Sequence, residues 1–83
     1  MPRTHPLVVV QTWFLSGELF EMELASDHDA STKLRFVTRD RELYDIALRL
    51  EGQDQRIAVD WHWARGVVRM VDAIHPTTKE HSR

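Results

Sequence analysis

Residues 18–25 read ELFEMELA, and this stretch decides the fold because its apolar and acidic side chains alternate. A period of two is typical of a β-strand with one buried and one solvated face. Phe20, Met22 and Leu24 then lie on the buried face, and the two glutamates between them lie in water. The stretch therefore predicts a strand beside the core of a β-protein.

A second alternating stretch, residues 32–38, reads TKLRFVT and follows a polar loop. Directly opposed residues of an antiparallel pair share a face, so Leu34 and Phe36 belong with the apolar side of residues 18–25. The two stretches are therefore expected to form a hairpin with one apolar face. The register that also matches opposite charges sets Glu23 beside Lys33 and Glu21 beside Arg35.

The chain before this hairpin supplies a further strand. Residues 7–15 are rich in valine and aromatic residues, and a Ser-Gly turn follows them. Residues 7–10 are apolar on both faces, whereas a strand with one wet face would alternate. Both faces of this strand are therefore expected to be covered.

The last third of the chain reads as a second hairpin. Residues 56–63 alternate and place Trp61 and Trp63 on the same face as the aliphatic residues before them, so both indoles are expected in the core. The dipeptide Arg65-Gly66 provides a two-residue turn into residues 67–74.

The expected register of this second hairpin sets Trp61 opposite Met70 and Trp63 opposite Val68. It also opposes Val59 to Asp72, which is a mismatch between a buried and a charged side chain. Either a β-bulge shifts the register or Asp72 lies near the rim of the sheet.

Residues 39–51 fit two periods. The helical spacing is met by Leu43, Ile46, Ala47 and Leu50, and the strand spacing by Tyr44, Ile46, Leu48 and Leu50. The flanking residues favour a helix, because Thr38 or Asp40 can cap its start and Gly52 follows its end. An ion pair between Asp45 and Arg49 would add to it.

These elements predict a mainly β fold in the order β-β-β-α-β-β. Five short antiparallel strands around one core indicate a small barrel or a strongly bent sheet, because closure protects the edges. Residues 1–83 form one domain, with an ordered core over about residues 7–74 and flexible ends at 1–6 and 76–83.

Composition narrows the classes of function. The net charge of −2 argues against broad, non-specific binding of nucleic acid, which usually needs an excess of Lys and Arg. No apolar run approaches the roughly 18–20 residues that cross a bilayer, so no membrane contact is expected. The chain has no cysteine, which suits the reducing cytoplasm.

Residues 64–71 read ARGVVRMV, and this stretch resembles the second sequence signature of the Sm-like family. That signature has an aliphatic residue, Arg or Lys, Gly, two variable residues, and then alternating aliphatic positions. The resemblance implies a five-stranded barrel of the Sm-like or SH3-like kind that self-associates and binds RNA. The likeness in sequence covers eight residues, and the likeness in outline covers residues 7–74.

Two sets of residues are candidates for binding. The basic and imidazole side chains that could contact RNA phosphates or bases are Lys33, Arg35, Arg39, Arg65, Arg69 and His62. The apolar residues of the two-sided strands, which could join a second copy and make a homo-oligomer, are Val8, Val9, Val10, Val67, Met70 and Val71. The alternative for the second set is burial within a single closed barrel.

We therefore expect a non-enzymatic binding module whose partner is RNA or another protein. A second hypothesis is a regulatory subunit that accepts a strand at an exposed sheet edge. Asp60 and His62 share a strand face and could form an acid–base pair, but no nucleophile accompanies them. The Asp27-His28-Asp29 loop lacks the four converging ligands of structural zinc, so no metal site is expected there. No catalytic residue and no cofactor are expected either.

Overall fold

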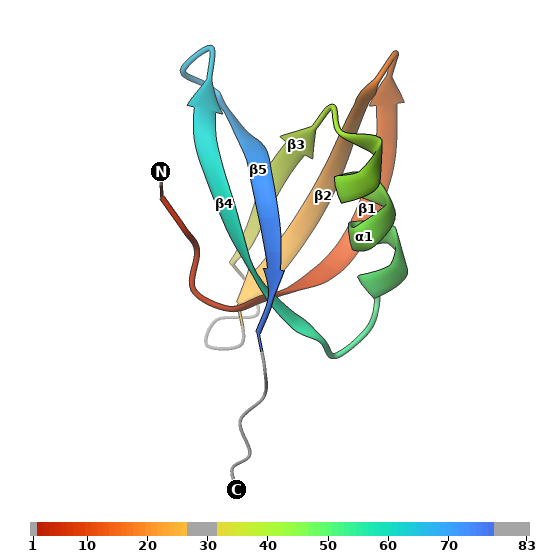
Figure 1. The fold of residues 1–83 in the computed structure, drawn as a ribbon, viewed down its shortest axis with the longest axis vertical. Coiled ribbons are helices and arrows are strands. Elements are labelled where there is room, and N and C mark those ends of the chain that lie inside the picture. Colours follow the sequence, from red (N-terminus) through yellow and green to blue (C-terminus); the bar gives the residue numbers. More distant parts are fainter. Residues whose placement is uncertain (1, 27–31, 78–83) are drawn as a thin grey trace, which may run out of the picture.

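Five strands and one helix follow one another in the order expected from the sequence (Figure 1). The computed structural model describes residues 2–26 and 32–77. The Asp27-His28-Asp29 loop lies outside these residues. The elements are β1 (Leu7–Ser16), β2 (Leu19–Ser26), β3 (Lys33–Thr38), α1 (Arg41–Leu50), β4 (Arg56–Ala64) and β5 (Val68–Pro76).

The strands close into a barrel in the order β1-β2-β3-β5-β4. Strands β1, β2 and β3 are joined in sequence, and β4 returns through α1 to lie beside β1, which is the 4-1-2-3 arrangement of a Greek key. Strand β5 forms a hairpin with β4 and meets β3. The fold is therefore a small five-stranded Greek-key barrel.

The pairing of β3 with β5 differs from the antiparallel pairing that was expected. Four neighbouring pairs are antiparallel, but β3 and β5 are parallel where Val37 pairs with Met70. Up and down directions cannot alternate all the way around a ring of five strands, so one pair has to be parallel. The expectation of a wholly antiparallel sheet is wrong at this seam.

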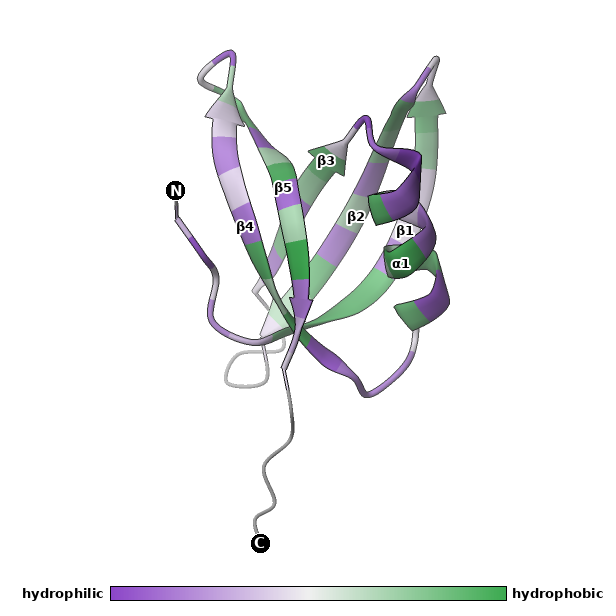
Figure 2. Cartoon of the chain, viewed as in Figure 1, coloured by the Kyte–Doolittle hydropathy of each residue, from purple (hydrophilic) through white to green (hydrophobic). Residues whose placement is uncertain are grey.

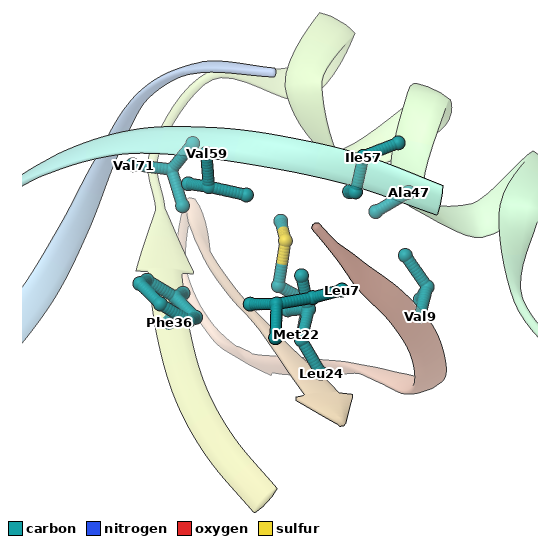
Figure 3. Packing of buried hydrophobic residues seen from close by; sticks show 9 residues of the cluster. All are labelled: Leu7, Val9, Met22, Leu24, Phe36, Ala47, Ile57, Val59 and Val71. Carbon is teal, nitrogen blue, oxygen red and sulfur yellow. The ribbon is translucent and has the colours of Figure 1, made fainter. Parts of the chain in front are cut away.

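The core lies where the inner faces of the strands meet α1. Met22, Leu24, Phe36, Ile57 and Val59 are fully buried, and their side chains point toward one another across the barrel (Figure 3). Along β2, β3 and β4, apolar residues alternate with polar ones (Figure 2). The two-residue periodicity thus assigns the inner face of β2, β3 and the first half of β4 correctly.

The second half of β4 departs from this pattern. Trp61 is partly buried and packs against the core, whereas Trp63 is 52% exposed. Trp63 lies next to the β4–β5 turn, where the hairpin rises toward solvent (Figure 1). The expectation that Trp63 lies in the core is wrong, because β4 continues beyond the residues that pack against the core.

The β2–β3 hairpin forms with the expected inner face but with a different register. Glu23 lies opposite Arg35, not Lys33, and Met22 lies opposite Phe36. Attraction between exposed charges contributes only about 0–1 kcal/mol, which is too little to fix a register. The charge-matched register was therefore wrong by two residues.

The β4–β5 hairpin contains a bulge, which is one of the two explanations that the Val59–Asp72 mismatch left open. The register shifts between Asp60 and Trp61, so Val59 lies opposite Ile74 and Trp61 opposite Val71. Asp72 is the extra residue on β5 and is exposed. The expected pair of Trp61 with Met70 is replaced, and the bulge removes the charge from the core.

Residues 41–50 form a helix, as the flanking residues indicated. The Asp40 carboxylate accepts a hydrogen bond of 2.8 Å from the backbone N–H of Glu42 and caps the start. Arg41 pairs with Asp45 at 3.2 Å, in place of the expected Asp45–Arg49 pair. Ala47 faces the barrel and is fully buried.

The β4–β5 turn has a conformation that its first residue disfavours. Arg65 and Gly66 have φ values of 56° and 71°, and the Val67 N–H donates to the Ala64 carbonyl at 3.2 Å. Positive φ at both central residues is the type I′ turn, for which Asn-Gly is preferred.

We expect Arg65→Asn to raise the free energy of unfolding by up to about 1 kcal/mol, because asparagine tolerates a positive φ better than arginine does. Arg65→Val should lower it, since a β-branched residue adopts this conformation at a greater cost. Urea unfolding of both variants measures the difference. Equal stability of the two variants would refute this account of the turn.

Candidate functional site

An aromatic cluster surrounds one arginine near the β4–β5 turn. The guanidinium carbon of Arg69 on β5 lies 5.0 Å from the Trp63 ring centre, 5.5 Å from that of Trp61 and 5.9 Å from that of Phe36. The two indoles meet edge to face, with centroids 5.0 Å apart and an interplanar angle of 87°. We call Phe36, Trp61, Trp63 and Arg69 the tryptophan–arginine cluster.

Register and topology bring this cluster together. Trp63 lies directly opposite Arg69 in the β4–β5 hairpin, and the parallel seam brings β3 and Phe36 alongside β5. Within residues 2–26 and 32–77, no carboxylate forms an ion pair with Arg69. The rings hold the side chain while its N–H donors stay available to an added anion or base.

The six candidate RNA-binding residues fall into separate groups. Arg65 lies in the turn next to the tryptophan–arginine cluster, and Arg39 lies between β3 and α1; both are exposed. Neither has an ion-pair partner in the described part of the chain. Arg39, Arg65 and Arg69 thus form no ion pair with a carboxylate of residues 2–26 and 32–77.

The other three candidates lie elsewhere or are paired. Arg35 is on the outer face of β3, 3.7 Å from a Glu23 carboxylate oxygen and 5.4 Å from the Trp13 ring centre. His62 lies 2.9 Å from the Asp72 carboxylate. Lys33 begins β3, at the far end of that strand from Arg39. The structure thus groups Arg65 and Arg69 and separates Lys33 and Arg35 from them.

A groove lies between the β1–β2 turn and the start of α1. Its volume is about 570 Å³, and it is lined by Phe14, Gly17, Glu18, Phe20, Arg39, Arg41 and Tyr44. The Phe20 and Tyr44 rings stack with centroids 4.2 Å apart, and Phe14 is 61% exposed. Sequence reasoning missed Phe14 and Tyr44 as surface aromatics; the turn that follows Phe14 within three residues was the available signal.

The candidate self-association residues separate in the same way. Val9 and Val71 are buried in the core, and Val8, Val10 and Met70 are half-buried. Of this set, Val67 alone is largely exposed, at 74%. The two-sided apolar pattern of β1 is therefore explained at Val9 by burial within one chain.

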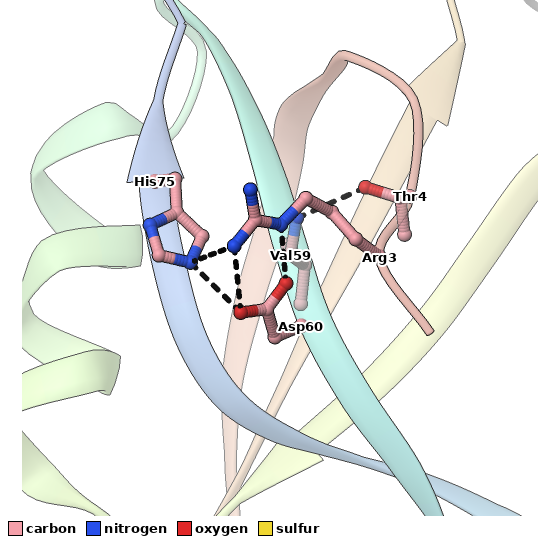
Figure 4. A network of polar contacts seen from close by, with 5 residues as sticks. All are labelled: Arg3, Thr4, Val59, Asp60 and His75. Atoms are coloured by element: carbon pink, nitrogen blue, oxygen red, sulfur yellow. Dashed lines mark hydrogen bonds and ion pairs between the residues drawn. The ribbon is translucent and has the colours of Figure 1, made fainter. Parts of the chain in front are cut away.

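The N-terminal residues form a strap along β4 (Figure 4). The Thr4 N–H donates to the Val59 carbonyl at 3.0 Å, and the Trp61 N–H donates to the Pro2 carbonyl at 3.2 Å. The sequence placed these residues in a flexible end, but Pro2 to Thr4 cover part of the β4 edge. Residues 78–83 lie outside the described part of the chain.

An ion-pair network fastens this strap. Arg3 donates two hydrogen bonds to the Asp60 carboxylate, at 2.6 and 3.1 Å, and His75 lies 2.9 Å from the same carboxylate. The bond from Arg3, followed by the one from His75, holds the pKa of Asp60 well below its usual range. Asp60 and His62 therefore have separate partners and do not form the acid–base pair considered from the sequence.

The strap should detach when this carboxylate loses its charge. Because the folded pKa of Asp60 is lowered, its contribution to stability is present at neutral pH and is lost only as the pH falls below the usual carboxyl range. We expect Asp60→Asn to speed amide hydrogen exchange at Trp61 at pH 7, with Glu42→Gln on α1 as the control. Unchanged exchange at Trp61 would contradict this role.

No three His, Asp or Glu side chains converge as a metal site among the residues that the structure describes. The described residues also contain no helix with the length and apolarity needed to span a bilayer.

The chain matches no protein-family model, no curated protein and no solved structure. Its chemistry is therefore read from the geometry: exposed aromatic rings beside cations without carboxylate partners.

Proposed function

We propose that this protein is a non-enzymatic module that binds single-stranded nucleic acid, RNA foremost, at the barrel end formed by the tryptophan–arginine cluster. The observation that carries the proposal is the half-exposed Trp63 beside Arg69, which has no carboxylate partner in residues 2–26 and 32–77. An indole stacks on an unpaired base, and a guanidinium contacts phosphate or a base edge. Arg65, in the adjoining β4–β5 turn, adds a second cation beside them.

A single strand suits this surface better than a duplex. Stacking on a side chain requires a base that is free of its own stack, as in single strands and loops. The net charge of −2 also leaves little long-range attraction for the dense charge of a double helix. Local contacts by a few arginines and rings therefore have to supply the affinity.

The architecture supports the proposal by analogy. A five-stranded Greek-key barrel is the form of the OB-fold, in which the β2–β3 face and the β1–β2 and β4–β5 loops bind oligonucleotides or oligosaccharides. The Sm-like resemblance points to RNA as well, although that family usually begins with a helix and this chain places its helix between β3 and β4. Of the OB-fold binding elements, the β4–β5 loop is the one that adjoins the tryptophan–arginine cluster.

Binding through a free sheet edge has less support. The barrel is closed, and the strap of residues 2–4 occupies part of β4. The regulatory-subunit alternative would need that strap to leave.

The absence of cysteine agrees with a cytoplasmic location, which we include in the proposal.

Fluorescence anisotropy with a labelled, unstructured 12-nucleotide RNA tests the proposal. We expect binding at low salt, with log K falling against log salt by about 0.7 for each phosphate contacted. Phosphate contacts by Arg65 and Arg69 would give a slope of about −1.4. A duplex of the same sequence should bind more weakly. No binding at low salt, or equal binding of the duplex, would refute the proposal.

A further inference from the structure

The exposed apolar side chains gather at the tips of two hairpins. The exposed large hydrophobic residues of the described chain, apart from Leu48, are Phe14, Leu15, Trp63, Val67 and Val68. The first two lie next to the β1–β2 turn and the others next to the β4–β5 turn, and both turns project from the same end of the barrel (Figure 1). An apolar surface concentrated in this way is typical of an interaction site.

The two tips carry opposite charges. Glu18 is the charged residue of the β1–β2 turn, Ser16-Gly17-Glu18, and Arg65 is that of the β4–β5 turn, Arg65-Gly66-Val67. Both side chains are exposed, and neither forms an ion pair within the part of the chain that the structure describes. The β1–β2 tip is thus apolar and carries an acidic side chain, which lines a groove together with Arg39 and Arg41, and the β4–β5 tip is apolar and basic.

We infer that two copies of this chain associate end to end, with the β1–β2 tip of each copy against the β4–β5 tip of the other. A two-fold axis across the barrel end exchanges the two tips, so the same acidic–basic contact forms twice and the assembly closes as a dimer. Phe14 and Leu15 of one copy then cover Val67 and Trp63 of the other. Charge complementarity selects a second copy over other occupants.

This dimer has a consequence for the proposed binding surface. Trp63 belongs both to the tip contact and to the tryptophan–arginine cluster, so a second copy and an oligonucleotide compete for it. The inference does not depend on nucleic-acid binding, because the tip contact requires the protein alone. Glu18 is not part of the proposed nucleic-acid surface, and its replacement separates the two ideas.

Paired charge reversals measured by sedimentation velocity test the dimer. We expect Glu18→Lys and Arg65→Asp each to raise the dimer dissociation constant at least tenfold, since each places like charges at both contacts. Asp-Gly suits the type I′ turn, so Arg65→Asp should not disturb the hairpin. Glu42→Lys on α1 reverses an exposed charge elsewhere and should leave the dissociation constant unchanged.

A mixture of the two variants gives the decisive result. In a mixed dimer, the introduced lysine faces the introduced aspartate at one contact, and the native Arg65 and Glu18 face each other at the second. We expect the mixture to dimerise although each variant alone is monomeric. Dimerisation of both single variants, failure of the mixture to dimerise, or a monomeric native protein would each overturn the inference. Glu18→Lys should still bind the oligonucleotide, and more tightly than the native chain at protein concentrations where the native chain is dimeric, because a second copy no longer competes for Trp63.

Discussion

Replacing Phe36 with alanine should remove a large part of the stability of this protein. Phe36 is fully buried at the centre of the core, and its ring meets Trp61 edge to face with centroids 6.1 Å apart. Truncating a buried phenylalanine costs about 3–5 kcal/mol. A chain of 83 residues has only about 4–12 kcal/mol to lose. We expect the free energy of unfolding to fall by about 3–5 kcal/mol, which is a quarter or more of the total, and the urea midpoint to fall with it.

Urea unfolding followed by tryptophan fluorescence measures this loss. Phe14→Ala is the matched control, because Phe14 is 61% exposed and its truncation removes little buried area. The control should cost less than about 1 kcal/mol. Similar losses in the two variants would mean that Phe36 does not lie at the centre of the barrel.

Replacing Trp63 with alanine should weaken the binding of single-stranded RNA roughly 5- to 150-fold. Loss of one stacked base costs about 1–3 kcal/mol, and each 1.4 kcal/mol is a factor of ten in affinity. The ring is half-exposed, so the barrel should still fold without it. Circular dichroism confirms folding, and anisotropy titration measures the affinity.

Trp13→Ala is the matched control for this measurement. Trp13 also lies beside an arginine, since the Arg35 guanidinium carbon is 5.4 Å from its ring centre. Arg35, however, lies 3.7 Å from Glu23, whereas Arg69 has no ion-pair partner among the described residues. We expect Trp13→Ala to bind as the native chain does. An equal loss in both variants would move the binding surface away from the tryptophan–arginine cluster.

The elements of the fold follow from the sequence because each carries a local signal. Burial of one face imposes a period of two on residues 18–25, and the helix is marked by its cap at Asp40. The mismatch between Val59 and Asp72 left a bulge or a place near the rim for Asp72, and the structure has the bulge, beside Trp61. These features depend on residues that are close in the sequence, or on which face of a strand is buried.

The pairing of the strands did not follow in the same way. The register of β2 with β3 depends on the whole core, and exposed charges such as Glu23 and Lys33 are too weakly coupled to set it. The parallel seam at Val37 and Met70 results from closing a ring of five strands. No local sequence pattern in β3 or β5 indicates that these two strands pair.

Six residues were expected to form one RNA-binding set, and their role in binding stays a prediction. The structure brings Arg65 and Arg69 of that set to the same end of the barrel. Trp63 was assigned to the core because alternation shows which face of the strand a side chain lies on. It does not show how far along the strand the packed core extends. Tyr44 was missed because its stacking on Phe20 joins elements that are distant in the sequence.

The most direct test of the proposed binding surface is the indole N–H spectrum of the ¹⁵N-labelled protein during titration with single-stranded RNA. The three tryptophans give three signals, from Trp13 on the outer face and from Trp61 and Trp63 in the cluster. We expect the Trp63 signal to shift most and that of Trp13 to stay in place. A spectrum in which Trp63 does not change, or in which Trp13 alone responds, would contradict the proposal.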